Sequence, residues 1–174
     1  MLKVKGFTLV ELLITLAIIG ISIATPRFAN IVADNKLVTQ YNGLVAAISL
    51  TRSEAIKRGQ RVTICQSADT RSCTKDSANW HDGWVVFVDS NEDNKIDSNE
   101  SILRVQQTIT DMNISFGART RIAYHPNGFS VGGSNGTFLF CDHRGEAGKK
   151  GLITSISGRA RLAKGTDLSS KPCP

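Results

Sequence analysis

The spacing of apolar residues divides the chain into two parts. From Phe7 to Thr25 the sequence contains no basic side chain and a single acid, Glu11. A helix of that length rises about 28 Å, which is close to the thickness of the hydrocarbon layer of a bilayer. The pattern therefore predicts a transmembrane helix that ends near Pro26 and Arg27.

Beyond Pro26 the apolar pattern remains helical. Apolar residues recur at steps of three, four and seven, which places them on one face of an amphipathic helix. Lys57, Arg58 and Gly59 then form a typical helix end, with two cations in the last turn and a glycine cap. We expect one helix from about 7 to 58, with a membrane segment at 7–28 and an amphipathic continuation at 29–59. The apolar face comprises Leu37, Tyr41, Leu44, Ile48 and Ala55.

From Arg61 onward the apolar period changes to two, which indicates β-strands. Eight short apolar segments are separated by Gly, Asn, Asp or Ser residues. The predicted fold class is α+β: a long amino-terminal helix packed on one or two antiparallel sheets formed by residues 60–174. The strand candidates are "RVTIC", "GWVVFVD", "SILRV", "NISF", "RIAYH", "TFLFC", "GLITSIS" and "RARLA".

Glu11 distinguishes the apolar run from a secretory signal peptide, which also joins a positive start to an apolar stretch. The basic segment "MLKVKG" is short, no small-residue cleavage pattern follows the run, and helical patterning continues beyond it. A charged residue in the membrane costs about 2.5–3.5 kcal/mol and usually has a partner. No Lys or Arg lies one turn away within the run. The partner must therefore be a new amino terminus or another chain.

The segment "KGFTLVELL" resembles the class III signal of type IV pilins and of the pseudopilins of type II secretion. The resemblance implies a leader at 1–6 that a prepilin peptidase cuts after Gly6, and a mature chain that begins with N-methylated Phe7. It also implies that Glu11 pairs with the α-amino group of a neighbouring pilin during assembly. The protein would cross the inner membrane once, with a periplasmic carboxyl-terminal domain, before joining a pilus or pseudopilus.

The rest of the chain resembles the GspH/FimT group of minor pilins and pseudopilins, and FimT most. This narrower resemblance rests on "VVFVDSNEDNKIDSNESILR" and on the terminal "SGRAR", in addition to the amino-terminal region. Within that group, a GRxR element belongs to a DNA-binding surface of FimT-type pilins. Similar Gly-Arg endings also occur in relatives that are not known to bind DNA.

The charge of the chain is concentrated toward its end. The net charge is +6, and residues 101–174 carry ten Lys or Arg against four Asp or Glu. Alternation along "GRAR" places Arg159 and Arg161 on one strand face about 7 Å apart, the spacing of successive phosphates. The candidate DNA contacts are Arg159, Arg161, Lys164, Arg144, Lys149 and Lys150. The alternative is a solvated strand face. Tyr124 and the few other aromatic residues form no obvious base-stacking platform.

Four cysteines lie in the part expected outside the cytoplasm. An even number in an oxidising compartment favours two disulfides, for which three connectivities exist. We favour Cys65–Cys73, which closes a short loop, and Cys141–Cys173, which ties the tail to a strand. A zinc site is the alternative, but no CxxC pair is present and the nearby His143 stands alone.

The segment "DSNEDNKIDSNE" matches a twelve-residue calcium loop at five positions, Asp89, Asn91, Asp93, Asp97 and Glu100. The sixth position carries asparagine, which tolerates the left-handed conformation. The segments on both sides are strand-like, whereas an ideal calcium loop lies between helices. We therefore favour a solvated hairpin over a calcium site, and we predict no metal and no other cofactor.

No arrangement of the sequence indicates an enzyme: no nucleophile–His–acid set and no glycine-rich phosphate loop is apparent. The favoured hypothesis is a minor type IV pilin that binds extracellular DNA without sequence preference during natural transformation. The main alternative is a structural minor pilin or secretion pseudopilin that primes filament assembly and binds no DNA. A calcium-stabilised adhesin is a third hypothesis.

Overall fold

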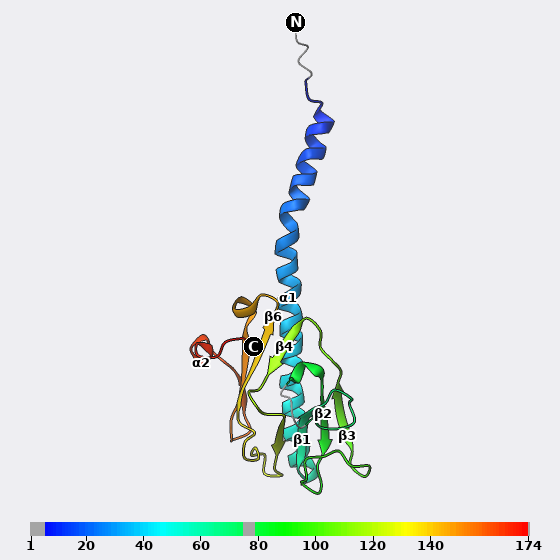
Figure 1. Cartoon of the computed structure of the whole chain (residues 1–174), viewed down its shortest axis with the longest axis vertical. Coiled ribbons are helices and arrows are strands. Elements are labelled where there is room, and N and C mark those ends of the chain that lie inside the picture. Colours follow the sequence, from blue (N-terminus) through cyan, green and yellow to red (C-terminus); the bar gives the residue numbers. More distant parts are fainter. Residues whose placement is uncertain (1–5, 75–78, 174) are drawn as a thin grey trace. The chain divides into compact units, whose positions relative to one another are not determined.

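The computed structural model describes residues 6–74 and 79–173, except for the side chains of 21–27 (Figure 1). The chain forms two compact units that divide between Lys36 and Leu37. Of the predicted leader, residues 1–5 lie outside the described part of the chain.

Helix α1 spans Leu9–Arg58, as the apolar period predicts. At its start, the backbone N–H of Glu11 donates a hydrogen bond to Thr8 Oγ1 at 3.2 Å, which satisfies one of the free donors of the first turn. At its end, Gly59 adopts a left-handed φ of 62°, the conformation that glycine provides most easily after a helix.

The first unit exposes an apolar surface. Eleven large apolar side chains of its described part are 54–77% exposed: Phe7, Leu9, Val10, Leu12, Leu13, Ile14, Leu16, Ile18, Ile19, Phe28 and Ile31. Among the described side chains, no helix combines the length and hydropathy that crossing a membrane requires. The predicted membrane segment at 7–28 includes side chains outside that set, so it stays a prediction.

The second unit contains two four-stranded antiparallel sheets. The first has the order β3-β2-β1-β5 and comprises β1 (Val62–Gln66), β2 (Trp84–Val88), β3 (Ile102–Gln106) and β5 (Arg121–Tyr124). The second has the order β4-β6-β7-β8 and comprises β4 (Met112–Ser115), β6 (Gly136–Asp142), β7 (Lys150–Thr154) and β8 (Ala160–Leu162). Each of the eight predicted strands has its counterpart. Short helical turns complete the unit at η1 (Trp80–Asp82), η2 (Gly145–Gly148) and α2 (Gly165–Leu168).

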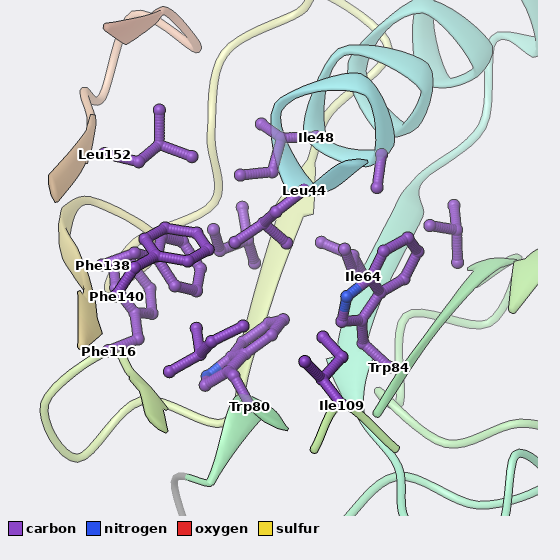
Figure 2. Packing of buried hydrophobic residues seen from close by; sticks show 14 of the residues in the cluster. Leu44, Ile48, Ile64, Trp80, Trp84, Ile109, Phe116, Phe138, Phe140 and Leu152 are labelled. Carbon is purple, nitrogen blue, oxygen red and sulfur yellow. The ribbon is translucent and has the colours of Figure 1, made fainter. Parts of the chain in front are cut away.

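The main core lies between the carboxyl-terminal half of α1 and the two sheets. Figure 2 shows Leu44 and Ile48 of α1 directed between an aromatic group and Ile64. In that aromatic group the rings of Phe116 and Phe138 stack with centroids 4.0 Å apart. Such ring pairs add to the stabilisation that area burial provides. The predicted apolar face of α1 is thus the face that is buried.

Two disulfides join parts of the second unit, with the pairing that the loop lengths favour. Cys65 is bonded to Cys73, and Cys141 is bonded to Cys173. The second bond connects β6 to the tail across 32 residues. Closing a loop of that size contributes on the order of 3 kcal/mol through the entropy of the unfolded chain.

Candidate nucleic-acid interface

The turn between β7 and β8 is held by backbone contacts. The N–H of Ser155 donates to the carbonyl of Arg159 at 2.9 Å, and the N–H of Gly158 donates to the carbonyl of Ser155 at 2.9 Å. Gly158 has a φ of 78°, and a Cβ placed there would lie 2.3 Å from the carbonyl oxygen of Gly128. Only glycine allows this approach, so the glycine of "GRAR" sets where the following arginine leaves the surface.

The side chains after this turn alternate between solvent and core. Arg159 and Arg161 are exposed, and Ala160 between them packs against the main core. Leu162, which alternation places with Ala160, is 57% exposed because β8 is a short edge strand. Lys164 is also exposed. Three of the predicted cations therefore lie along one edge of the second sheet.

Arg161 is engaged with an acid of the next element. Its Nη1 lies 2.9 Å from Oδ2 of Asp167, and the same oxygen accepts the backbone N–H of Lys164 at 2.9 Å. The hydrogen bond from Arg161 is the main cause of a lowered pKa at Asp167, followed by the bond from the Lys164 backbone. A phosphate would have to compete with this carboxylate for Arg161.

Arg144 and Lys149 face protein partners. Nε of Arg144 lies 3.1 Å and 3.0 Å from the two carboxylate oxygens of Asp142, and its Nη2 lies 2.6 Å from Oδ2. Nζ of Lys149 donates to the carbonyls of Leu168 and Lys171 at 3.1 Å and 2.8 Å, and it lies 2.5 Å from Glu146. The Lys149 side chain is only 10% exposed, and its hydrogen bonds hold the carboxyl-terminal tail. Their positive charges, predicted to face DNA, are largely balanced inside the protein.

Lys150 occupies an intermediate position. It lies in β7 opposite Phe140, and it is half-buried. Of the six predicted cations, the structure brings Arg159, Arg161 and Lys164 together on the β8 edge.

Three further residues beside the turn, Arg52, Phe129 and Ile156, are not among the predicted site residues. Nε of Arg52 in α1 donates to the carbonyl of Gly128 at 2.9 Å, which brings a further guanidinium to the contact between Gly128 and Gly158. Phe129 and Ile156 are 53% and 64% exposed on the two segments that meet there. The signal that identifies Phe129 and Ile156 is the exposure of a large apolar side chain, and only the folded structure reveals that exposure.

Tyr124 lies beneath this contact and is fully buried. Burial raises the pKa of its hydroxyl to about 12, although the charge of Arg52 acts in the opposite direction. The hydroxyl has no hydrogen-bond partner among the described residues. Tyr124 therefore supports the turn from inside and cannot stack on a ligand.

The acids at the two ends of the acidic loop between β2 and β3 bind groups of the protein itself, whereas Glu92 between them is 56% exposed. Asp89 is fully buried, accepts a hydrogen bond from Thr63 Oγ1 at 2.8 Å and lies 3.3 Å from Nε of Arg61. Glu100 accepts the backbone N–H groups of Ser90 and Asp97 at 2.8 Å and 3.3 Å. Across the described residues, no group of three or more His, Cys, Asp or Glu side chains is arranged to hold a metal ion.

The assembly residues lie in the first unit. Gly6 and Phe7 precede α1 and are exposed, and Glu11 is exposed in its first turns. The pairing of Glu11 with the amino terminus of another subunit stays a prediction.

Comparisons with known proteins agree on one family and one fold. A family model described as type II transport protein GspH matches residues 40–158, and a prokaryotic N-terminal methylation motif matches residues 1–25. No curated protein matches significantly. The chain is similar to the type IV minor pilin FimU of Pseudomonas aeruginosa, with 21% identity over 76% of this chain and 91% of FimU and a TM-score of 0.57.

It is also similar to the minor pseudopilin EpsH from the type 2 secretion system of Vibrio cholerae. The identity is 13% over 74% of this chain and 96% of EpsH, with a TM-score of 0.51. At such identities the likeness to both structures shows the fold alone.

Proposed function

Because the chain belongs to the GspH family of type II transport proteins, we propose that it is a minor type IV pilin that binds extracellular DNA. Binding would occur through phosphates, without sequence preference, during DNA uptake in natural transformation. The family consists of structural filament subunits, the minor pilins and pseudopilins, and not of enzymes.

The exposed side chain of Arg159 is the observation that carries the proposal. The packing of Gly158 on Gly128 places the turn, and the packing of Ala160 on the core turns Arg159 outward. A guanidinium held at the surface by a rigid backbone can form bidentate hydrogen bonds to a phosphate. Lys164 adds a second exposed cation beyond β8.

We expect weak and strongly salt-dependent binding. If Arg159, Arg161 and Lys164 neutralise about three phosphates, the logarithm of the affinity for duplex DNA falls with the logarithm of salt at a slope of about −3. Arg144 and Lys149 add little, because their side chains are paired with Asp142 and Glu146 and are only 17% and 10% exposed. Arg161 is also paired, with Asp167, but its side chain is 55% exposed, so a phosphate can compete for it. Several subunits that act together along a filament would supply the useful affinity.

The test uses the full chain in a nonionic detergent and a random duplex at several salt concentrations. Arg159→Gln combined with Arg161→Gln is expected to reduce the slope to about −1 and to weaken binding of unrelated sequences equally. The control removes the same charge elsewhere on the second unit, with Lys95→Gln in the loop between β2 and β3 and Arg104→Gln in β3. If the double arginine variant binds like the unchanged protein, the DNA-binding proposal fails.

Processing and assembly follow from the amino-terminal motif. We propose cleavage by a prepilin peptidase between Gly6 and Phe7, N-methylation of Phe7, and pairing of Glu11 with a neighbouring subunit. Gly6→Val should leave an uncut precursor in the inner membrane, whereas Glu11→Ala should be cut but poorly incorporated into filaments. Mass spectrometry of assembled material that finds an intact Met1 terminus would contradict this proposal.

The exposed apolar side chains of α1 favour a second candidate, a purely structural role in a pilus or secretion pseudopilus. Such a surface fits a helix that packs against other pilin helices in a filament core. The arginine variant separates the two roles in cells. Loss of DNA uptake with normal filaments indicates DNA binding, whereas loss of the filaments indicates a structural role.

A further inference from the structure

An exposed apolar patch of two side chains, Phe129 and Ile156, lies beside the contact between Gly128 and Gly158. Phe129 directly follows Gly128 and is 53% exposed, and Ile156 lies two residues before Gly158 and is 64% exposed. The two segments are bonded together, because the N–H of Ser130 donates to the carbonyl of Ile156 at 3.0 Å. The two apolar side chains therefore leave the surface from adjoining backbone segments.

Two guanidiniums accompany this patch. Arg52 reaches it from α1 and donates its Nε–H to the carbonyl of Gly128 at 2.9 Å. Arg159 follows Gly158 directly, and a Cβ on Gly158 would lie 2.8 Å from Nε of Arg52. An apolar surface with arginines in the adjoining segments is complementary to a ligand that presents both flat apolar faces and negative charge.

Single strands of DNA have this chemistry. Proteins that bind them combine cations for the phosphates with exposed aromatic rings on which bases stack. In a duplex each base is stacked between its neighbours, so an exposed phenylalanine ring finds little free base surface on which to stack. In a single strand the bases are free to turn toward the ring while the adjacent phosphate reaches an arginine.

We propose that Phe129 is a base-stacking platform, and that the surface formed by Phe129, Ile156 and Arg159 binds single-stranded DNA in preference to a duplex. Arg159 binds the phosphate next to the stacked base, and Ile156 provides an apolar contact beside the ring. This inference rests on the proposed function, because Arg159 belongs to both. It adds a contact to the base, which phosphate binding alone does not require.

The experiment compares three dye-labelled ligands of equal length: a twelve-nucleotide thymidine strand, an abasic strand with the same phosphates, and a duplex. The full chain in nonionic detergent is titrated with each ligand at one salt concentration. We expect the unchanged protein to bind the thymidine strand at least about fivefold more tightly than the abasic strand, since stacking of one base accounts for such a ratio.

Two variants resolve the contributions. Phe129→Leu keeps an apolar side chain and loses the ring, so the ratio between the thymidine and abasic strands should fall toward one. Arg159→Gln should weaken both strands by a similar factor. Ile102→Ala, at a residue that is 45% exposed on β3 in the other sheet, is the matched control and should keep the ratio. Thermal unfolding checks that each variant is folded.

The outcomes separate this inference from the proposed function. A thymidine strand that binds no better than the abasic one, or a Phe129→Leu variant that keeps the ratio, overturns the stacking role. If duplex binding then still depends on Arg159, the proposed function stands. If none of the three ligands binds, both fail. A further outcome also overturns the inference. If Phe129→Leu abolishes self-association in sedimentation but keeps the ratio between the thymidine and abasic strands, the patch contacts a second copy of the chain and not a base.

Discussion

Two charged connections of the second unit differ in where their charges go. The acidic loop joins β2 to β3, and the basic turn with the strand after it joins β7 to α2. In the acidic loop, Asp89 is buried and paired with Arg61, and Glu100 accepts backbone N–H groups. After the basic turn, Arg159 and Lys164 are exposed.

The difference follows from the hydrogen-bonding capacity of the side chains. Asp and Asn are short acceptors that bond the N–H groups of their own loop, as Asp93 does with Lys95 and Asn91 with Asp93. Arg and Lys are long and only donate, so on an edge strand they extend into water unless a carbonyl or carboxylate is near. A run of acids in a loop can thus be structural, whereas a run of cations on an edge strand remains available to a ligand.

Removing the buried acid tests the structural side of this comparison and should have the largest effect. Asp89→Ala leaves the nearly buried Arg61 without its main counter-charge, which we expect to lower the free energy of unfolding by about 3 kcal/mol. Urea unfolding measures it. Glu92→Ala is the control, because Glu92 lies 3.7 Å from Arg61 but is 56% exposed. Equal losses in both variants would contradict the structural role of Asp89.

Lys149 is a cation that, like Asp89 of the acidic loop, binds partners within the protein. Lys149→Met removes its bonds to the tail carbonyls of Leu168 and Lys171 and should lower the free energy of unfolding by about 1–2 kcal/mol. DNA affinity should change much less than in Arg159→Gln. A variant that unfolds like the unchanged protein but loses DNA binding would place Lys149 back in the interface.

Acid should weaken the structural pairs and spare the interface. Hydrogen bonds from Arg144 are the main cause of a lowered pKa at Asp142, so this carboxylate stabilises the fold above its unfolded pKa. That contribution is lost as the pH falls below about 4 and through the folded pKa. Urea unfolding at pH 6, 4 and 3 should show the decline, and Asp142→Asn should show less of it. An equal decline in both would assign the acid sensitivity to other carboxylates.

The smallest effect is expected at Tyr124, an uncharged residue buried beneath the basic turn. Tyr124→Phe removes a buried hydroxyl that has no hydrogen-bond partner among the described residues, so stability should stay the same or rise by up to about 1 kcal/mol. Thermal unfolding measures the change, and DNA binding should not change. A clear loss of stability would mean that the hydroxyl is hydrogen-bonded in solution.

Most of the secondary structure of this protein can be predicted from its apolar pattern. Helix α1 was predictable because its apolar positions recur with the helical period, and the eight strands because short apolar segments alternate with turn residues. The disulfide pairing agreed with the loop lengths. The amino-terminal motif "KGFTLVELL" indicates the family without reference to the fold.

Which charges face solvent depends on contacts between segments that are distant in sequence. Sequence spacing does not distinguish Lys149 from Lys164. In the fold, Lys149 donates hydrogen bonds to carbonyls of the tail, whereas Lys164 is exposed to solvent. Likewise Arg52, Phe129 and Ile156 are far apart in sequence and meet where Gly128 touches Gly158. The physical reason is that local patterns record which side chains a backbone segment turns inward, whereas the partners of a charge or an exposed ring come from segments that only folding brings together.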